Sequence, residues 1–120
     1  MGRRIMIVDD APIVRLMLKD ILVYNGYEVV AECSNGAEAV QTYKELKPDL
    51  VTLDIIMPEK DGIEALSEIL DFDGSAKVVM VTAVDQREAL MKAIRLGATD
   101  YIVKPFESER VVSAIANALQ

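Results

Sequence analysis

The stretch IMIVDDAP, residues 5–12, joins a run of apolar residues to two adjacent carboxylates and then to a proline. The apolar run predicts a buried strand, and the proline suits the first turn of a following helix. Two like charges crowded at the end of a buried strand are unfavourable unless something stabilises them. The stretch therefore predicts a strand, a loop and a helix, with a stabilising partner for Asp9 and Asp10.

The same alternation continues along all 120 residues. Short apolar segments predict strands, and apolar residues at the i, i+3, i+4, i+7 spacing predict helices between and after them. The predicted strands span residues 4–8, 28–31, 50–53, 78–81 and 101–103. The helical patterns fall within residues 14–21, 37–46, 63–70, 90–97 and 112–119. Repeated βαβ units predict an α/β fold, a doubly wound five-stranded parallel sheet with five helices on its two faces.

Length and composition narrow the class of protein. We expect one domain over residues 1–120, because 52% hydrophobic residues are ample for a single core. The net charge of −7 argues against a surface for nucleic acid or anionic membrane. No apolar run suits a membrane span or a secretory signal, so we expect a cytoplasmic protein. The lone cysteine, Cys33, excludes an internal disulfide, and we expect a packed thiol.

The chain has no histidine. This removes histidine as a nucleophile activator, a general base and a metal ligand. Any chemistry must therefore use oxygen atoms and lysine.

Polar side chains follow four of the five predicted strands. The first strand is followed by Asp9 and Asp10, the third by Asp54, the fourth by Thr82 and the fifth by Lys104. In open parallel sheets, ligands bind outside the carboxyl ends of the strands, where the strand order reverses. With the flavodoxin-like strand order 2-1-3-4-5, these residues would lie side by side. The second strand would be an edge strand, outside this group.

The charge of this group predicts a cation. Each residue alone is more often a helix cap, a turn former or a solvated charge, and only their joint occurrence at one edge indicates a site. Three carboxylates and one ammonium leave about two negative charges uncompensated. The ligands are hard oxygen atoms, which suit Mg²⁺ and disfavour zinc or copper. We therefore predict that the acidic group holds Mg²⁺ and that the metal brings a phosphoryl group with it.

Four motifs, in order and spacing along the whole chain, resemble the receiver domain of two-component response regulators: IVDD, LDIIMPEKDG, VTA and YIVKPF. The resemblance implies that Asp54 accepts a phosphoryl group from a phosphohistidine on a partner histidine kinase. It also implies that Asp10 and Asp54 bind Mg²⁺ directly, with the backbone carbonyl of Ile56 as a third ligand and Asp9 acting largely through water. The protein would then catalyse only its own phosphorylation and dephosphorylation.

The resemblance also implies how the signal leaves the site. Lys104 would pair with the phosphoryl oxygens, and Thr82 would donate its hydroxyl to one of them. Tyr101 would be the switch aromatic, which turns inward when Thr82 moves. The face made by the fourth helix, fifth strand and fifth helix, within residues 86–119, would bind a target protein, and the Lys104–Pro105 bond would be cis.

The first helix makes the chain most similar to the chemotaxis members of this family. We expect a monomer that binds the flagellar motor switch. The alternative is a phosphorelay intermediate, or a receiver separated from a DNA-binding or other output domain. Two positions depart from many chemotaxis members, because Ile56 and Val84 are apolar where polar side chains influence the hydrolytic water. We predict that Ile56→Asn loses its phosphoryl group faster.

Two other classes share parts of this pattern. Phosphatases of the haloacid dehalogenase type also use an aspartyl nucleophile and Mg²⁺, but they need a second Asp where this chain has Ile56. Flavodoxins hold FMN at the same edge, but they need a phosphate loop after the first strand, where DDAP would repel phosphate. Both classes are weaker alternatives.

Overall fold

The computed structural model describes residues 3–120 as an alternating α/β chain. The strands are β1 (Arg4–Val8), β2 (Glu28–Cys33), β3 (Leu50–Asp54), β4 (Val78–Ala83) and β5 (Asp100–Lys104). The helices are α1 (Pro12–Tyr24), α2 (Gly36–Leu46), α3 (Gly62–Phe72), α4 (Arg87–Leu96) and α5 (Ser108–Ala118). Each predicted strand and helix is present.

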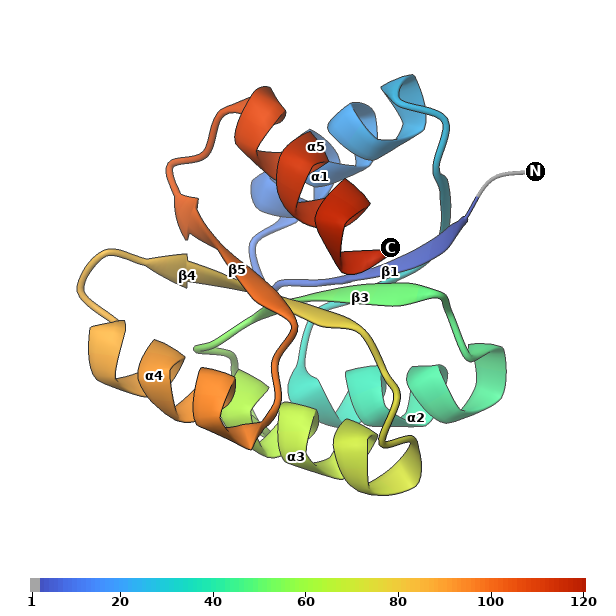
Figure 1. The fold of residues 1–120 in the computed structure, drawn as a ribbon. Coiled ribbons are helices and arrows are strands. Elements are labelled where there is room, and N and C mark those ends of the chain that lie inside the picture. Colours follow the sequence, from blue (N-terminus) through green and yellow to red (C-terminus); the bar gives the residue numbers. More distant parts are fainter. Residues whose placement is uncertain (1–2) are drawn as a thin grey trace.

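The strands form one parallel sheet in the order β2-β1-β3-β4-β5, as the sequence predicts (Figure 1). The order reverses next to β1, so the loops after β1 and β3 leave the sheet side by side. Four strands extend one or two residues beyond the prediction. Their ends carry polar residues that an apolar pattern excludes, although the backbone still pairs there, as at Glu32 opposite Ile7.

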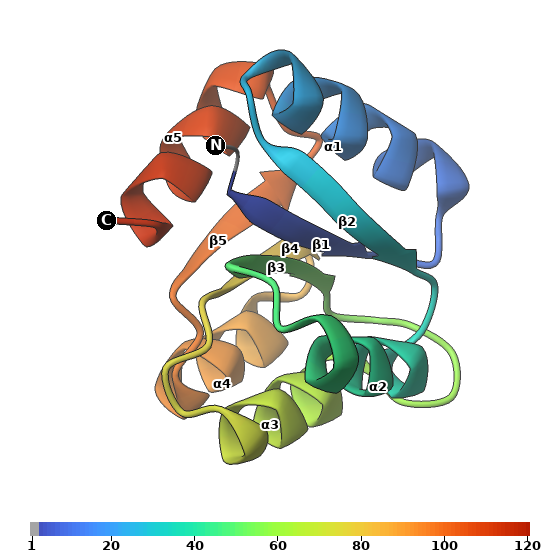
Figure 2. The same ribbon diagram turned by 90° about the vertical axis from the view of Figure 1, so that its right-hand side faces the viewer.

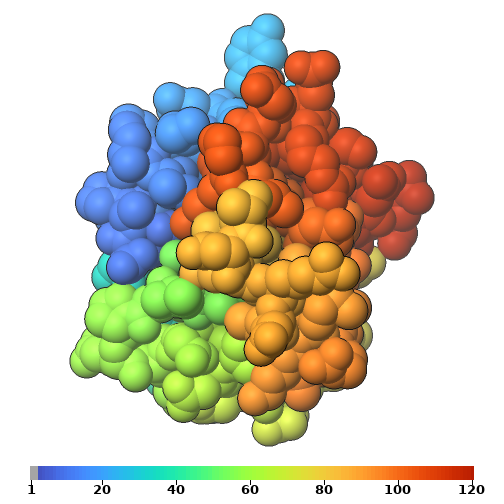
Figure 3. Space-filling view, turned by 90° about the vertical axis from the view of Figure 1, so that its left-hand side faces the viewer, coloured from blue at the N-terminus to red at the C-terminus, as the bar shows by residue number. Residues whose placement is uncertain are grey.

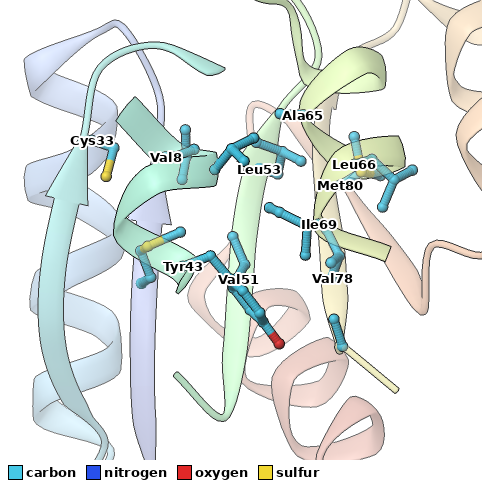
Figure 4. Packing of buried hydrophobic residues seen from close by; sticks show 14 of the residues in the cluster. Val8, Cys33, Tyr43, Val51, Leu53, Ala65, Leu66, Ile69, Val78 and Met80 are labelled. Carbon is cyan, nitrogen blue, oxygen red and sulfur yellow. The ribbon is translucent and has the colours of Figure 1, made fainter. Parts of the chain in front are cut away.

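Helices cover both faces of the sheet, with α1 and α5 on one face and α2, α3 and α4 on the other (Figures 1 and 2). Each layer encloses its own buried apolar cluster. Figure 4 shows part of the larger one, where Met80 and Val78 of β4 lie beside Leu66 and Ile69 of α3. All five residues of β3 are buried, because this central strand is covered on both faces.

The two outer strands are more polar than the central ones. In β2, Glu28 and Glu32 are exposed, whereas Cys33 is buried, as predicted for a packed thiol. Burial raises the pKa of that thiol, so it stays protonated and unreactive. In β5, only Ile102 is fully buried.

The helix and turn signals fall where the sequence places them. Pro12 is the first residue of α1, and Gly97 ends α4 with a φ of 121°. The Lys104–Pro105 bond is cis, as the resemblance implied. Within residues 3–120, no helix is both long enough and apolar enough to cross a membrane.

Candidate functional site

The carboxyl ends of β1, β3, β4 and β5 bring the predicted site residues to one edge of the sheet. Asp9 and Asp10 follow β1, Asp54 and Lys104 end β3 and β5, and Thr82 is the second-last residue of β4. Ligand oxygens of the three aspartates all lie within 4.8 Å of one another. Asp9, Asp54 and Thr82 are buried, whereas Asp10 is exposed. The structure thus brings Asp9, Asp10, Asp54 and Lys104 together, with Thr82 near the end of the neighbouring strand.

This edge can be followed in Figure 3, where the segments after β1, β3, β4 and β5 meet. They are coloured blue, green, gold and orange-red, in chain order. The site is thus built from loops that lead from the sheet to helices on both of its faces.

Lys104 connects two of the strands through its ammonium group. Its Nζ lies 3.0 Å from Asp9 Oδ2 and 3.3 Å from Asp54 Oδ1. Burial alone would lower the pKa of Lys104, but the two carboxylates outweigh burial and raise it. Lys104 is therefore a fixed positive charge between β1 and β3.

The pKa of the Asp54 carboxyl group is raised. Burial raises its pKa to about 6, and the charge of Asp9 adds to this effect. Lys104 and the backbone N–H of Ile55, which donates to Oδ1 at 2.9 Å, oppose the rise. One ammonium therefore does not compensate the acidic group, and additional positive charge would favour the ionised form.

The donor atoms suit a magnesium ion. Asp9 Oδ2 is buried and accepts no well-aligned hydrogen bond within the described residues, although Lys104 lies close by. Asp9 Oδ1 already accepts from the N–H of Ala11 at 2.9 Å. The ligand set of Asp9, Asp10 and Asp54 consists of oxygens only, which is the chemistry of Mg²⁺ sites.

Thr82 does not contact the carboxylates in this arrangement. Its hydroxyl lies 3.1 Å from Gln86 Oε1 and 3.2 Å from the carbonyl of Ala83. Gln86 Oε1 also accepts the backbone N–H of Ala83 at 2.9 Å. The sequence alone does not predict this role of Gln86, because only its position in VTAVDQ, four residues after Thr82, indicates such a contact.

Tyr101 lies on the same face of the sheet as Thr82. It pairs with Met80 across the β4–β5 ladder, and Thr82 is two residues beyond Met80 on the same strand. A hollow of about 400 Å³ between these side chains and α4 is lined by both Thr82 and Tyr101. The ring is 39% exposed, and the Arg110 guanidinium lies 5.6 Å from its centre. Arg110 also donates to the Tyr101 carbonyl.

The rim of the site carries two exposed apolar side chains. Ile56 is 62% exposed and Val84 is 78% exposed. Both line a second hollow at the start of α4. The two positions that are apolar here and polar in many chemotaxis members thus lie at the mouth of the site.

Gly62, the last residue of the LDIIMPEKDG motif, is a second residue whose role the sequence alone does not predict. A Cβ atom there would lie 2.0 Å from the carbonyl oxygen of Asp54. The N–H of Gly62 donates to the carbonyl of Ile55 at 2.6 Å. The loop after β3 therefore folds back against the backbone of Asp54, which only glycine allows at this distance.

The fold and the acidic, oxygen-only site are those of a phosphoryl-accepting receiver. The response regulator receiver domain model matches residues 5–116, so the chain belongs to that family. The chain is 56% identical over 119 residues to the chemotaxis protein CheY of Bacillus subtilis, covering 99% of each. It is 54% identical over 115 residues to CheY of Thermotoga maritima, covering 96% of each.

A solved structure shows the same fold with a metal. It is the CheX–CheY–BeF3–Mg²⁺ complex from Borrelia burgdorferi, with a TM-score of 0.94 and 33% identity. The match covers 98% of this chain and 90% of that one. The function of the chain is therefore that of a chemotaxis response regulator, a signalling phosphoacceptor rather than a classical enzyme. Its cluster of Asp9, Asp10 and Asp54 fits the kind of ion that the Borrelia complex holds.

Proposed function

We propose that Asp54 accepts a phosphoryl group from a phosphohistidine of a partner histidine kinase. The observation that carries the proposal is the position of Asp54, buried at the carboxyl end of β3 between two further aspartates and the Lys104 ammonium. Because the chain has no histidine, the phosphohistidine must come from another protein. Residues 1–120 form one receiver domain in this proposal.

The chemistry is a displacement at phosphorus. A carboxylate oxygen of Asp54 forms the new O–P bond, and the N–P bond of the donor breaks with its electron pair going to the leaving nitrogen. Asp54 Oδ1 already accepts from Ile55 and Lys104, and neither bond uses Oδ2. The ammonium of Lys104 is placed to neutralise charge on the phosphoryl oxygens, and the Thr82 hydroxyl donates to one of them after it turns.

The metal ligands follow from the family by position. Asp10, Asp54 and the Ile56 carbonyl would hold Mg²⁺ directly, and Asp9 would act largely through water. When bound, Mg²⁺ supplies positive charge against the carboxylates and the phosphoryl oxygens. The close grouping of three carboxylates around a single ammonium supports a cation at this place.

We propose that the output surface is the face of α4, β5 and α5. Thr82 and Tyr101 share one side of the sheet and line the same hollow, so movement of Thr82 opens space for the ring. Tyr101 then changes the shape of the face that a target protein contacts. Such coupling is typically about 1 to 3 kcal/mol, so phosphorylation shifts the populations of two forms.

The partners in this proposal are a histidine kinase and a target such as the flagellar motor switch. The chain acts as a cytoplasmic monomer without direct contact to nucleic acid or membrane. The identity with chemotaxis proteins over nearly the whole chain supports this choice. The alternative, a receiver from a longer regulator, is supported by a Mycobacterium tuberculosis transcriptional regulatory protein, PdtaR, which is 41% identical and of which the match covers 57%.

The phosphoacceptor is tested by intact mass. The protein is incubated with acetyl phosphate and Mg²⁺, and we expect a mass increase of one phosphoryl group. Asp54→Asn should show no increase, because its amide cannot form the acyl phosphate. An increase that persists in Asp54→Asn would show that another residue is the acceptor.

A further inference from the structure

We propose that Gln86 is a latch for Thr82. In this proposal, which rests on the phosphorylation of Asp54, Gln86 is a positioning residue. Its side chain holds the Thr82 hydroxyl away from the phosphoryl position and so opposes the phosphorylated form. One oxygen atom, Gln86 Oε1, accepts hydrogen bonds from both the Thr82 hydroxyl and the Ala83 N–H.

The neighbouring backbone fixes the orientation of the Gln86 carboxamide. The N–H of Ala83 lies 2.9 Å from Gln86 Oε1, and an N–H can only donate. The carbonyl end of the carboxamide, not its NH₂ end, must therefore face β4. Since that oxygen is an acceptor only, the Thr82 hydroxyl at 3.1 Å must be the donor.

The Thr82 hydroxyl has a single hydrogen atom to give. In the structure the nearby acceptors are Gln86 Oε1, from the loop after β4, and the carbonyl of Ala83, the last residue of β4, at 3.2 Å. Donation to a phosphoryl oxygen requires that the hydroxyl leave them. Thr82 is only 1% exposed, so water does not readily replace the lost partner on either side. The two arrangements of Thr82 therefore exclude each other.

Gln86 is held firmly enough to act in this way. Its own N–H donates to the Ala83 carbonyl at 3.1 Å, and its carbonyl accepts from Leu90 in α4 at 3.0 Å. Its side chain does not cap α4. Instead, it reaches back to β4. Gln86 thus links the end of β4 to the start of α4, and release of Thr82 leaves the side chain attached through Ala83 alone.

Binding of beryllofluoride with Mg²⁺ tests the latch. Fluorine NMR of the bound probe gives the affinity for the protein and its variants. We expect Gln86→Met, which has similar length and no acceptor oxygen, to bind the probe roughly threefold to tenfold more tightly, the equivalent of one neutral hydrogen bond. Gln86→Glu retains an acceptor and should bind no more tightly than the parent. Gln41→Ala, on the exposed side of α2, is the matched control and should bind as the parent does.

A double-mutant cycle separates the latch from a general loosening of α4. Thr82→Val keeps the shape of Thr82 and removes its hydroxyl. In this background the gain from Gln86→Met should disappear, because no hydroxyl remains to be released. A second readout is hydrogen exchange of the Ala83 amide in the free protein, which should be faster in Gln86→Met than in the parent.

The outcomes distinguish the latch from the proposed function. If the parent protein binds no beryllofluoride, the proposed phosphorylation of Asp54 is wrong. If the parent binds it and Gln86→Met binds equally well, only the latch is wrong. A gain that persists in the Thr82→Val background also overturns the latch, because the effect then does not act through the hydroxyl.

Discussion

Lys104 shows how single side chains determine the state of this site. Its ammonium partly compensates the charges of two buried carboxylates, Asp9 just after β1 and Asp54 at the end of β3. The pKa of Asp54 nevertheless remains raised, because burial and Asp9 outweigh Lys104. The site is therefore incompletely neutralised, which favours the arrival of a divalent cation.

Ile56 is expected to slow the loss of the phosphoryl group. Its side chain is exposed at the rim and cannot hydrogen-bond the water that hydrolyses an acyl phosphate. We expect Ile56→Asn to hydrolyse faster, by roughly threefold to tenfold if one hydrogen bond to that water forms in the transition state. The decay of the phosphorylated mass after removal of acetyl phosphate measures this rate. Ile56→Val is the apolar control, and equal or slower decay in Ile56→Asn would contradict the prediction.

Gly62 is expected to tolerate no side chain. An added Cβ would meet the Asp54 carbonyl at 2.0 Å, so Gly62→Ala must displace the backbone beside the phosphoacceptor. We expect a loss of about 1 to 3 kcal/mol in the free energy of unfolding, measured with urea. Gly74→Ala is the control, because its Cβ would meet nothing nearer than 3.9 Å. Equal stability of Gly62→Ala and the parent would contradict the geometry of this loop.

Among the elements, α2 and α3 are joined by one polar contact beside their apolar packing. The hydroxyl of Tyr43 in α2 donates to Asp73 Oδ2 at the end of α3, over 2.8 Å. Hydrogen bonds from Ser75 and then from Tyr43 lower the pKa of Asp73. Burial and the bond to Asp73 raise the pKa of Tyr43. The contact therefore has its full effect only when Asp73 is ionised and Tyr43 is protonated.

This contact predicts a pH dependence of stability. Because the pKa of Asp73 is lowered on folding, its contribution is present above its ordinary pKa of 3.8 and is lost as the pH falls below it. The pKa of Tyr43 is raised, so its contribution is complete below pH 10 and is lost as the pH rises further. We expect Tyr43→Phe to cost about 1 kcal/mol near neutral pH and less at pH values of about 3.

Urea unfolding at several pH values measures this effect. Tyr24→Phe is the control, because the Tyr24 side chain is 90% exposed. Ser75 still lowers the pKa of Asp73 in the Tyr43→Phe variant, so part of the acid sensitivity should remain. If Tyr43→Phe lowers the free energy of unfolding equally near neutral pH and near pH ~3, the hydrogen bond does not depend on the charge of Asp73.

The sequence predicts the elements well where apolar spacing defines them, and less well at their ends. The apolar run of β3 is continuous because the strand is covered on both faces. The end of β2 is missed because Glu32 is exposed, although its backbone pairs with Ile7. The positions of the candidate site residues are predictable because each lies at or just after the carboxyl end of a strand. The role of Gln86 cannot be predicted in this way, because it depends on how its side chain folds back across the loop to Thr82 and Ala83.

At the scale of the whole molecule, the order of the strands concentrates negative charge at one edge of the sheet. We expect Mg²⁺ to stabilise the folded chain, by about 1.4 kcal/mol when its concentration is ten times the dissociation constant. Thermal unfolding with Mg²⁺, and again after addition of a chelator, measures the effect. Because the Asp10 side chain is exposed, Asp10→Asn should fold normally. The variant should, however, no longer be stabilised by Mg²⁺. An equal response of Asp10→Asn and the parent would place the ion elsewhere.

The polar outer strands have a consequence for behaviour at high protein concentration. An unpaired strand edge is a template on which another chain can add a strand and begin to aggregate. Here β2 presents Glu28 and Glu32, and β5 begins with Asp100 and is followed by Pro105. Charged side chains on both edge strands would repel those of a second copy, and burying them between two chains is unfavourable. The edge strands therefore resist edge-to-edge pairing, and with it fibril formation, when the protein is concentrated.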